Sequence, residues 1–424
     1  MKDTPDYKRT KRACFYTYVA MSSAFGLPPL LFAAFRDMYG ISYTLLGTLV
    51  LVNFLTQLSI DLIFTFFHKK FNLKVTVRVM PLLTAAGLCV YALAPMFFPE
   101  RAYIGLLTGT VLFSVSAGLS EVLLSPTVAA LPSDNPERDM SALHSLYAYG
   151  LVGVILLSSL YLWLFGTENW MYLTLFWAAL PLVSFVLFTI SPMPEITMDE
   201  PASGEAVKKR NIGLMLCVIC IFMGSAAENS MTNWISVYAE SALGIPKLWG
   251  DILGMALFAI LLGAGRSLYA RFGKNISVVL LCGMGGAALF YIIAGLSVNS
   301  TVAMIACVLV GLCSSMLWPG TLILMEENLP RSGVGAYALL AAGGDFGAAI
   351  APQLVGVIVD AVSASAVAET LSASLSLTAE QIGIKAGILS AAFFPLIGVA
   401  VLLIIRKYFR KKQDDPIIDI GAPK

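Results

Sequence analysis

The chain has 424 residues and a formal net charge of +1; 58% of the residues are hydrophobic, 12% are charged, and the mean hydropathy is +0.82. Soluble domains carry about 25% charged residues, so the composition excludes an ordinary soluble domain. The near-neutral charge also argues against a nucleic-acid partner. One bilayer crossing needs about 20 consecutive apolar residues, and the sequence holds about twelve such stretches, which predicts an all-α, polytopic membrane protein.

The predicted spans cover residues 14–36, 43–67, 76–98, 103–130, 140–165, 169–190, 212–240, 247–270, 276–297, 300–326, 333–361 and 384–407. A polar, proline-containing segment, Ser191–Arg210, separates the sixth span from the seventh. This pattern divides the chain into a first six-helix half (1–190), a linker (191–211) and a second six-helix half with a tail (212–424). A second polar segment, Ser363–Gln381, predicts a surface helix.

Basic residues cluster in alternate loops, and both the linker and the C-terminal tail are basic. Under the positive-inside rule, this pattern places both termini and the linker in the cytoplasm. A multi-pass protein of the inner (plasma) membrane is therefore expected. The first span lacks a cleavage site, which indicates an uncleaved helix and not a signal peptide. The basic clusters are Lys8–Arg12, His68–Lys74, Val207–Arg210, Arg271–Lys274 and Arg406–Lys412.

The two halves carry similar segments. Pro126–Gly150 and Pro319–Gly343 have the same length, and Arg138 and Arg331 occupy the same position in that frame. Two six-helix halves repeated in parallel orientation are typical of the major facilitator architecture, in which the substrate binds between the halves near the bilayer midplane.

That architecture also carries a basic, glycine-containing loop after the second span of each half. The segment Arg266–Lys274 keeps this pattern, whereas the first copy is degenerate and has Asn72 where glycine is usual. We predict that Arg266 and Arg271 act in gating, together with Asp61 near the cytoplasmic end of the second span.

Charged residues near the centre of a span cost about 2.5–3.5 kcal/mol on insertion scales, so they are candidates for function. Glu121 in the fourth span and His144 in the fifth lie at a similar depth on either side of one cytoplasmic loop. A carboxylate beside an imidazole could load and release a proton as its surroundings alternate between wet and dry. The alternative is a static pair that fixes helix packing.

The seventh span carries a polar stripe of Glu228, Asn229, Asn233 and Trp234. Amides, a carboxylate and an indole on one helix face suit a sugar, whose hydroxyls need donors and acceptors and whose apolar face packs on an aromatic ring. The alternative for Trp234, and for Tyr238 one turn further on, is anchoring at the membrane interface.

Four further residues complete the predicted cavity. Asn53 and Gln57 share a face of the second span, and Trp318 lies in the tenth. Asp345, in the eleventh, is either a cavity residue or the partner of a cation such as Arg266.

Motifs for other chemistry are missing from the sequence. It has no Walker loop, so transport would be secondary and not driven by ATP. The seven cysteines lie in or beside apolar spans without metal-ligand spacing. No enzymatic activity and no cofactor are expected; the coupling ion would be a proton, with sodium left open.

At these residues the chain resembles the fucose–galactose–glucose:proton symporter family of the major facilitator superfamily. Glu121 precedes Pro126 by the same spacing that the family shows in its fourth helix. His144 and Tyr147 fall where the family carries a glutamine and an asparagine in its fifth, which implies a substrate-binding role for Tyr147. The glycine-rich segment Gly343–Asp360 is also similar.

The chain departs from this family in its first helix. Pro29 stands where the family has an intramembrane aspartate that is thought to work with the fourth-helix glutamate. Proton coupling by a first-helix aspartate and a fourth-helix glutamate therefore does not apply to this chain. His144, or Glu228 and Asp345, could substitute for the missing acid, and sodium coupling or none remains open.

The sequence thus predicts a monomeric secondary transporter that takes up a monosaccharide or related small polar solute with a proton by alternating access. Glu121 and His144 would carry the coupling. Alternatives are a sodium-coupled or uniport sugar carrier, an exporter of lipophilic cations and a membrane sensor that transports nothing. The predicted substrate site comprises Asn53, Gln57, Tyr147, Glu228, Asn229, Asn233, Trp234, Trp318 and Asp345.

Overall fold

The computed structural model describes residues 7–195, 211–329 and 334–414. Within these residues, twelve helical spans are long and apolar enough to cross a bilayer, which confirms the predicted spans. The first six are α1 (Lys8–Tyr39), α2 (Tyr43–Phe67), α3 (Leu73–Phe97), α4 (Ala102–Ala129), α5 (Pro136–Phe165) and α6 (Trp170–Ile190). Short 3₁₀ turns lie at His68–Lys70, Pro99–Arg101 and Thr167–Asn169.

The second six spans are less regular, because several consist of more than one helical segment. They are α7 (Asn211–Val237) with the π-helical η4 (Tyr238–Ala242); α8 (Lys247–Gly250), the π-helical η5 (Asp251–Ala256) and α9 (Leu257–Phe272); α10 (Ile276–Leu296); α11 (Ser300–Ser314) and α12 (Leu317–Asn328); α13 (Val334–Ser363); and α15 (Ala379–Ala391) with α16 (Phe393–Asp414). Between α13 and α15 lies α14 (Ala366–Leu375), which confirms the predicted surface helix.

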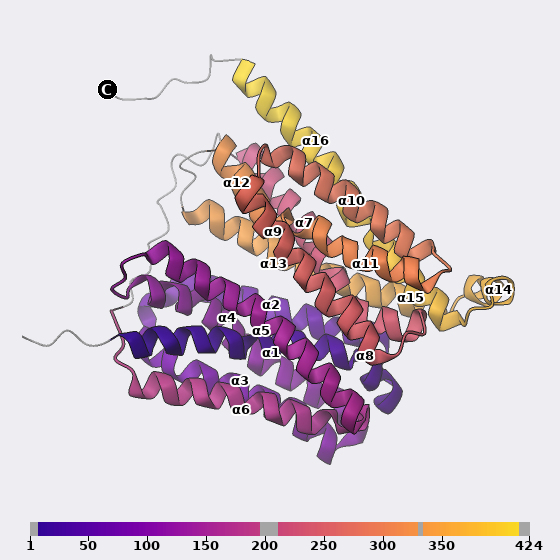
Figure 1. The fold of residues 1–424 in the computed structure, drawn as a ribbon, viewed down its shortest axis with the longest axis horizontal. Helices are drawn as coiled ribbons and strands as arrows, with labels where there is room; N and C mark the ends of the chain where they lie inside the picture. Colours follow the sequence, from indigo (N-terminus) through magenta and orange to yellow (C-terminus); the bar gives the residue numbers. More distant parts are fainter. Residues whose placement is uncertain (1–6, 196–210, 330–333, 415–424) are drawn as a thin grey trace, which may run out of the picture.

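The spans run roughly parallel between two ends of the molecule, and α1–α6 lie together beside α7–α16 (Figure 1). We call the right-hand end in this view, which carries α14, the α14 end. The opposite end, where α1 begins and α16 terminates, is the linker end. Most of the predicted linker, residues 196–210, lies outside the described residues, as does Arg331 of the sequence repeat.

The two halves are closed against each other at the α14 end. Helix α13 packs against both α2 and α7. The ring of Trp234 on α7 lies 5.8 Å from the ring of Phe32 on α1 and 5.8 Å from that of Tyr43 on α2. Gly356 on α13 allows the closest approach, since a Cβ atom there would lie 2.3 Å from the backbone oxygen of Tyr43.

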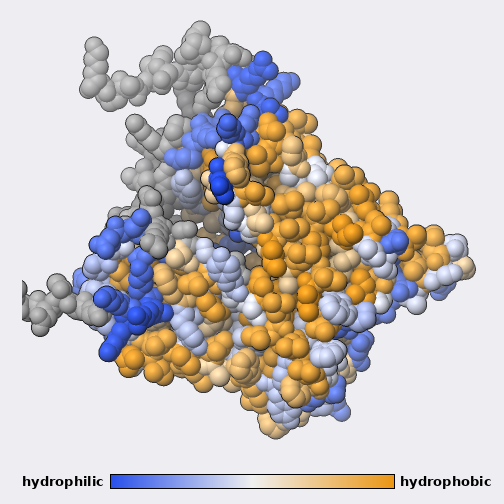
Figure 2. All heavy atoms as spheres, in the orientation of Figure 1, coloured by the Kyte–Doolittle hydropathy of each residue, from blue (hydrophilic) through white to orange (hydrophobic). Residues whose placement is uncertain are grey.

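The linker end is different. Polar contacts within the first half are found there: Thr10 donates to the backbone oxygen of Pro192 at 2.5 Å, and Lys11 forms an ion pair with Asp139. Glu121 and Arg266 are exposed although both lie inside membrane spans. Figure 2 shows the surface hollowed between the two halves on this side of the molecule. The space between the halves is therefore accessible from the linker end.

Candidate functional site

Two acids of the first half lie on neighbouring helices, α2 and α4. The helices touch at Gly118, where a Cβ atom would lie 3.2 Å from the Cα atom of Gln57. About one turn further along each helix are Glu121 and Asp61, whose charges lie within interaction range of each other. The Oδ1 atom of Asp61 is buried, and no described residue forms a hydrogen bond with it.

Asn53 and Gln57 belong to a hydrogen-bond network between α2 and α4. Gln57 Nε2 donates to Asn53 Oδ1 at 2.9 Å, and the Ser114 hydroxyl donates to the same oxygen at 2.6 Å. Gln57 is 3% exposed. It therefore packs between the helices in this conformation, contrary to its predicted place on the cavity wall, whereas Asn53 is partly exposed.

The second half contributes an ion pair. A terminal guanidinium nitrogen of Arg266 on α9 lies 3.5 Å from Glu228 Oε1 on α7, and Arg266 Nε donates to the backbone oxygen of Ser315 at 3.0 Å. The side chains of Arg266 and Glu228 are 45% and 18% exposed. The described partner of Arg266 is thus Glu228, and not Asp345.

Asp345 on α13 instead lies within electrostatic range of the acids of the first half, Glu121 and Asp61. The indole of Trp318 covers the neighbouring Gly344, where a Cβ atom would lie 2.2 Å from a ring carbon. Three carboxylates from three helices thus lie within electrostatic range of one another. Among the described residues, no group of three or more His, Cys, Asp or Glu side chains is arranged to hold a metal ion.

Tyr147 on α5 links the two halves of the site. Its ring packs edge-on against Phe25 with 5.8 Å between ring centres. Its hydroxyl is within electrostatic range of Glu121 in its own half and of Glu228 and Arg266 in the other. The side chain of His144, one turn earlier on α5, lies outside the described side chains. The predicted pairing of Glu121 with His144 therefore stays a prediction.

On α7, Asn229, Asn233 and Trp234 make contacts that the sequence did not suggest. Asn229 Nδ2 donates to the backbone oxygen of Ser225 at 3.1 Å, and Asn233 Nδ2 donates to that of Asn229 at 2.9 Å, so their amide donors serve their own helix. Trp234 is fully buried, and its indole N–H donates to the backbone oxygen of Pro352 at 3.0 Å. In this conformation Trp234 seals the α14 end and does not line the cavity.

The structure also places Tyr238 and Arg271, and the gating role of Arg271 stays a prediction. Tyr238 is fully buried and donates to the backbone oxygen of Ala294, so it is not an interfacial anchor. Arg271 lies near the linker end of α9 with its guanidinium 5.2 Å from the centre of the Phe272 ring, away from the central acids.

Sequence reasoning missed a buried charge cluster at the α14 end. Asp251 is 1% exposed. It accepts hydrogen bonds from Ser159 of the first half at 2.9 Å and Ser236 at 2.5 Å, and it lies 3.3 Å from Lys247 Nζ. The available signal was a lysine and an aspartate four residues apart at the start of a span.

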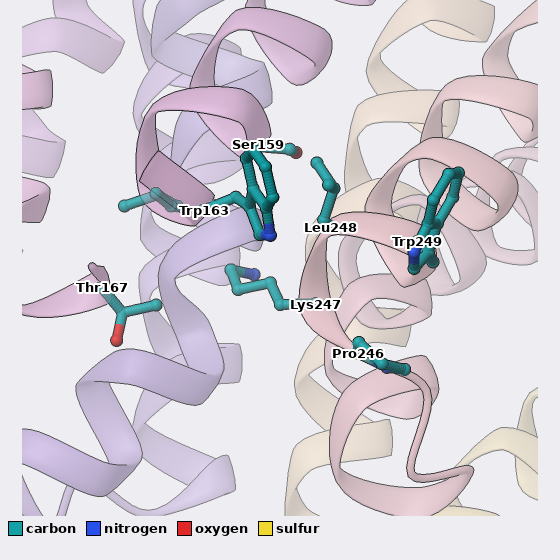
Figure 3. Close-up of a pocket in the computed structure, with 8 residues that line it drawn as sticks. Ser159, Trp163, Thr167, Pro246, Lys247, Leu248 and Trp249 are labelled. Carbon is teal, nitrogen blue, oxygen red and sulfur yellow. The ribbon is translucent and has the colours of Figure 1, made fainter. Parts of the chain in front are cut away.

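Beside this cluster, α5 and α8 enclose a cavity of 270 Å³ between the two halves. Figure 3 shows Trp163 of the first half and Lys247 of the second facing each other across it. The cavity is lined by Ser159, Leu162, Trp163, Thr167, Pro246, Lys247, Leu248 and Trp249. It lies away from the central acids and belongs to the closed contact at the α14 end.

Twelve spans in two groups around a polar, membrane-embedded site match a known sequence pattern. The pattern of the Major Facilitator Superfamily matches residues 13–352. The chain belongs to the Major Facilitator Superfamily. It is therefore a membrane transporter by family, and the space between its halves is where this superfamily binds its substrates.

Solved structures agree with this major facilitator fold. A bacterial homologue of the human lysosomal transporter Spinster, in an inward-facing and unoccupied conformation, superposes with a TM-score of 0.76 at 13% identity, covering 99% of this chain and 100% of that one. The E. coli fucose:proton symporter FucP gives a TM-score of 0.58 at 14% identity, covering 95% and 99%.

The nucleoside transporter NupG gives a TM-score of 0.68 at 14% identity, covering 94% of this chain and 98% of that one. At these identities the three structures show the fold alone. No protein with a curated description matches the chain by sequence.

Proposed function

We propose that this major facilitator is a secondary active transporter that takes up a monosaccharide or related small polar solute together with a proton. The observation that carries the proposal is the accessible residue Glu121 inside the membrane span α4, at the space between the two halves. The basic loops support an orientation with both termini in the cytoplasm. A monomer in the inner membrane is part of the same proposal. In that orientation the present conformation faces inward.

Proton coupling follows from how the surroundings of Glu121 change during alternating access. In this conformation Glu121 has an accessible surface. Closure of the linker end would exclude water from it while Asp61 and Asp345 remain within electrostatic range. A desolvated carboxylate among like charges is stable only in its neutral form. Glu121 would therefore bind a proton while the site is open toward the α14 end, keep it while the site is closed off from water, and release it to the cytoplasmic side after the linker end opens.

The substrate would lie between the acids of the first half and the Glu228–Arg266 pair of the second. The guanidinium supplies hydrogen-bond donors, the carboxylates supply acceptors, and Trp318 supplies an aromatic surface for an apolar sugar face. Tyr147, within electrostatic range of both sides, supplies a hydroxyl that can donate or accept. These groups suit a neutral solute rich in hydroxyls.

A second candidate is the export of organic cations in the same fold. The observation that favours it is charge: the described side chains of the site include the carboxylates of Asp61, Glu121, Glu228 and Asp345, but only the guanidinium of Arg266. An organic cation could occupy this negative site without a sugar being involved. Efflux of a cationic dye would favour this candidate.

The test is proton movement into liposomes that carry the purified protein, recorded on addition of each member of a sugar panel. The variants are wild type, Glu121→Gln and the control Glu369→Gln on exposed α14. One sugar should make the outside alkaline with wild type and the control. Glu121→Gln should abolish that signal yet retain exchange of labelled sugar. Proton movement at the wild-type rate by Glu121→Gln would refute the role of Glu121, and a silent panel would refute sugar symport.

A further inference from the structure

The N-terminus of α2 is capped by a side chain from the other half of the protein. Asp360 on α13 accepts hydrogen bonds from the backbone N–H groups of Tyr43 at 3.2 Å and Thr44 at 2.6 Å. These are the first two residues of α2. The first N–H groups of a helix have no partner within the helix, and the helix N-terminus carries a partial positive charge. A carboxylate at this point is therefore a strong acceptor.

A second carboxylate of the second half binds the same corner. Glu380 Oε1 on α15 accepts from Arg36 Nε at 2.5 Å and from the Tyr43 hydroxyl at 2.7 Å. The guanidinium of Arg36 also lies 4.2 Å from the centre of the Tyr43 ring. Arg36 belongs to the last turn of α1. Both carboxylates thus hold the α1–α2 corner against α13 and α15.

We propose that Asp360 and Glu380 are positioning residues that latch the α14 end and set the balance between the two conformations of the transport cycle. The proposal rests on alternating access, which is part of the proposed function. Because α2 and α13 belong to different halves, these contacts must break before the central site can open toward the α14 end. Each carboxylate then returns to water, and α2 loses its cap.

The sequence provides a local replacement for part of that cap. Ser42, immediately before α2, accepts a hydrogen bond from the N–H group of Leu45 at 3.3 Å. Serine is a favoured N-cap residue. Helix α2 can therefore keep its first turn when Asp360 withdraws, so the contact with Asp360 acts between the halves and is not needed to form the helix. This division suits a contact that breaks and forms in every cycle.

The experiment measures how often the α14 end opens. Val50 on α2 is 5% exposed and lies one turn beyond Gly47, which meets α13. A Val50→Cys reporter, in a background with Cys282→Ser, is treated in proteoliposomes with a membrane-impermeant maleimide from the α14 side. Its labelling rate follows the open fraction. The variants are Asp360→Asn, Glu380→Gln and the control Glu369→Gln on α14.

A capping carboxylate contributes a factor of about ten to such an equilibrium. Asp360→Asn should therefore raise the labelling rate about tenfold, Glu380→Gln should raise it in the same direction, and Asp360→Glu should restore part of the wild-type rate. Unchanged rates in both neutral variants would overturn the latch. Equal acceleration by the control would overturn it as well. The measurement needs no substrate, so it stands apart from the sugar and proton tests.

Discussion

Gly356 on α13 lies against the backbone of Tyr43 on α2, so Gly356→Ala should disturb the contact between the two halves. The added Cβ atom would lie 2.3 Å from the backbone oxygen of Tyr43, 2.9 Å from its carbonyl carbon and 3.1 Å from a ring carbon of Trp234. Ordinary van der Waals contact begins at 3.4 Å. Helix α2 would have to retreat by about 1 Å, and its backbone cannot rotate away as a flexible side chain could.

The size of the effect follows from the cost of overpacking. Adding a methyl group to a well-packed contact costs about 1–3 kcal/mol. This cost applies only while the α14 end is closed, because α2 and α13 separate when it opens. The higher helix propensity of alanine applies to both conformations and cancels. Gly356→Ala should therefore shift the equilibrium toward the open α14 end by about 5–150-fold.

The assay is the labelling rate of the Val50→Cys reporter from the α14 side, measured with and without Gly356→Ala. The matched control is Gly285→Ala on α10, because a Cβ atom at Gly285 has nothing within 4 Å. The control should leave the rate unchanged. A wild-type rate for Gly356→Ala, in protein whose thermal unfolding is normal, would show that the α2–α13 contact does not limit opening.

Two further predictions concern stability, measured as unfolding of the purified protein in detergent. Lys247→Met should lower the free energy of unfolding by about 3–5 kcal/mol, because it leaves buried Asp251 without its described cation. The control Lys274→Met, on the exposed α9–α10 loop, should change it little. Equal losses in the two variants would refute the ion-pair argument. Thr378→Ala should lower the free energy of unfolding by about 0.5–2 kcal/mol, because it removes the capping box of α15. The control is Thr370→Ala on α14. A loss for Thr378→Ala no larger than that of the control would contradict the capping role of Thr378.

Some predicted site residues could be found from the sequence, because a charged side chain inside a membrane span identifies itself by its energetic cost. A carboxylate or guanidinium inside an apolar span is rare and expensive. Glu121, Glu228, Asp345 and Arg266 were all visible on that ground. Their partners were not visible, because periodicity says which residues share a helix face but not which other helix that face meets. The pairing of Arg266 with Glu228, and not with Asp345, needed the tertiary structure, which brings the Arg266 side chain of α9 within reach of α7.

Trp234 is a second residue whose packing partners the local sequence could not show. The sequence places an indole on one face with Asn229 and Asn233, and a sugar-binding stripe is a reasonable reading of those residue types. The structure buries Trp234 against Phe32 and Tyr43 of the first half. A tryptophan that binds a sugar and a tryptophan that packs between the two halves can stand in the same local sequence. Only the approach of the halves distinguishes them.

The sequence by itself determined the twelve spans, the surface helix α14 and the presence of buried acids, because each depends on the length and polarity of a local segment. The tertiary structure alone decided which end of the molecule is closed and what closes it. Asp360 is separated by more than 300 positions from the helix that it caps, and Glu380 from Arg36. Such contacts exist only in one arrangement of two similar halves, and no local pattern encodes which arrangement is occupied.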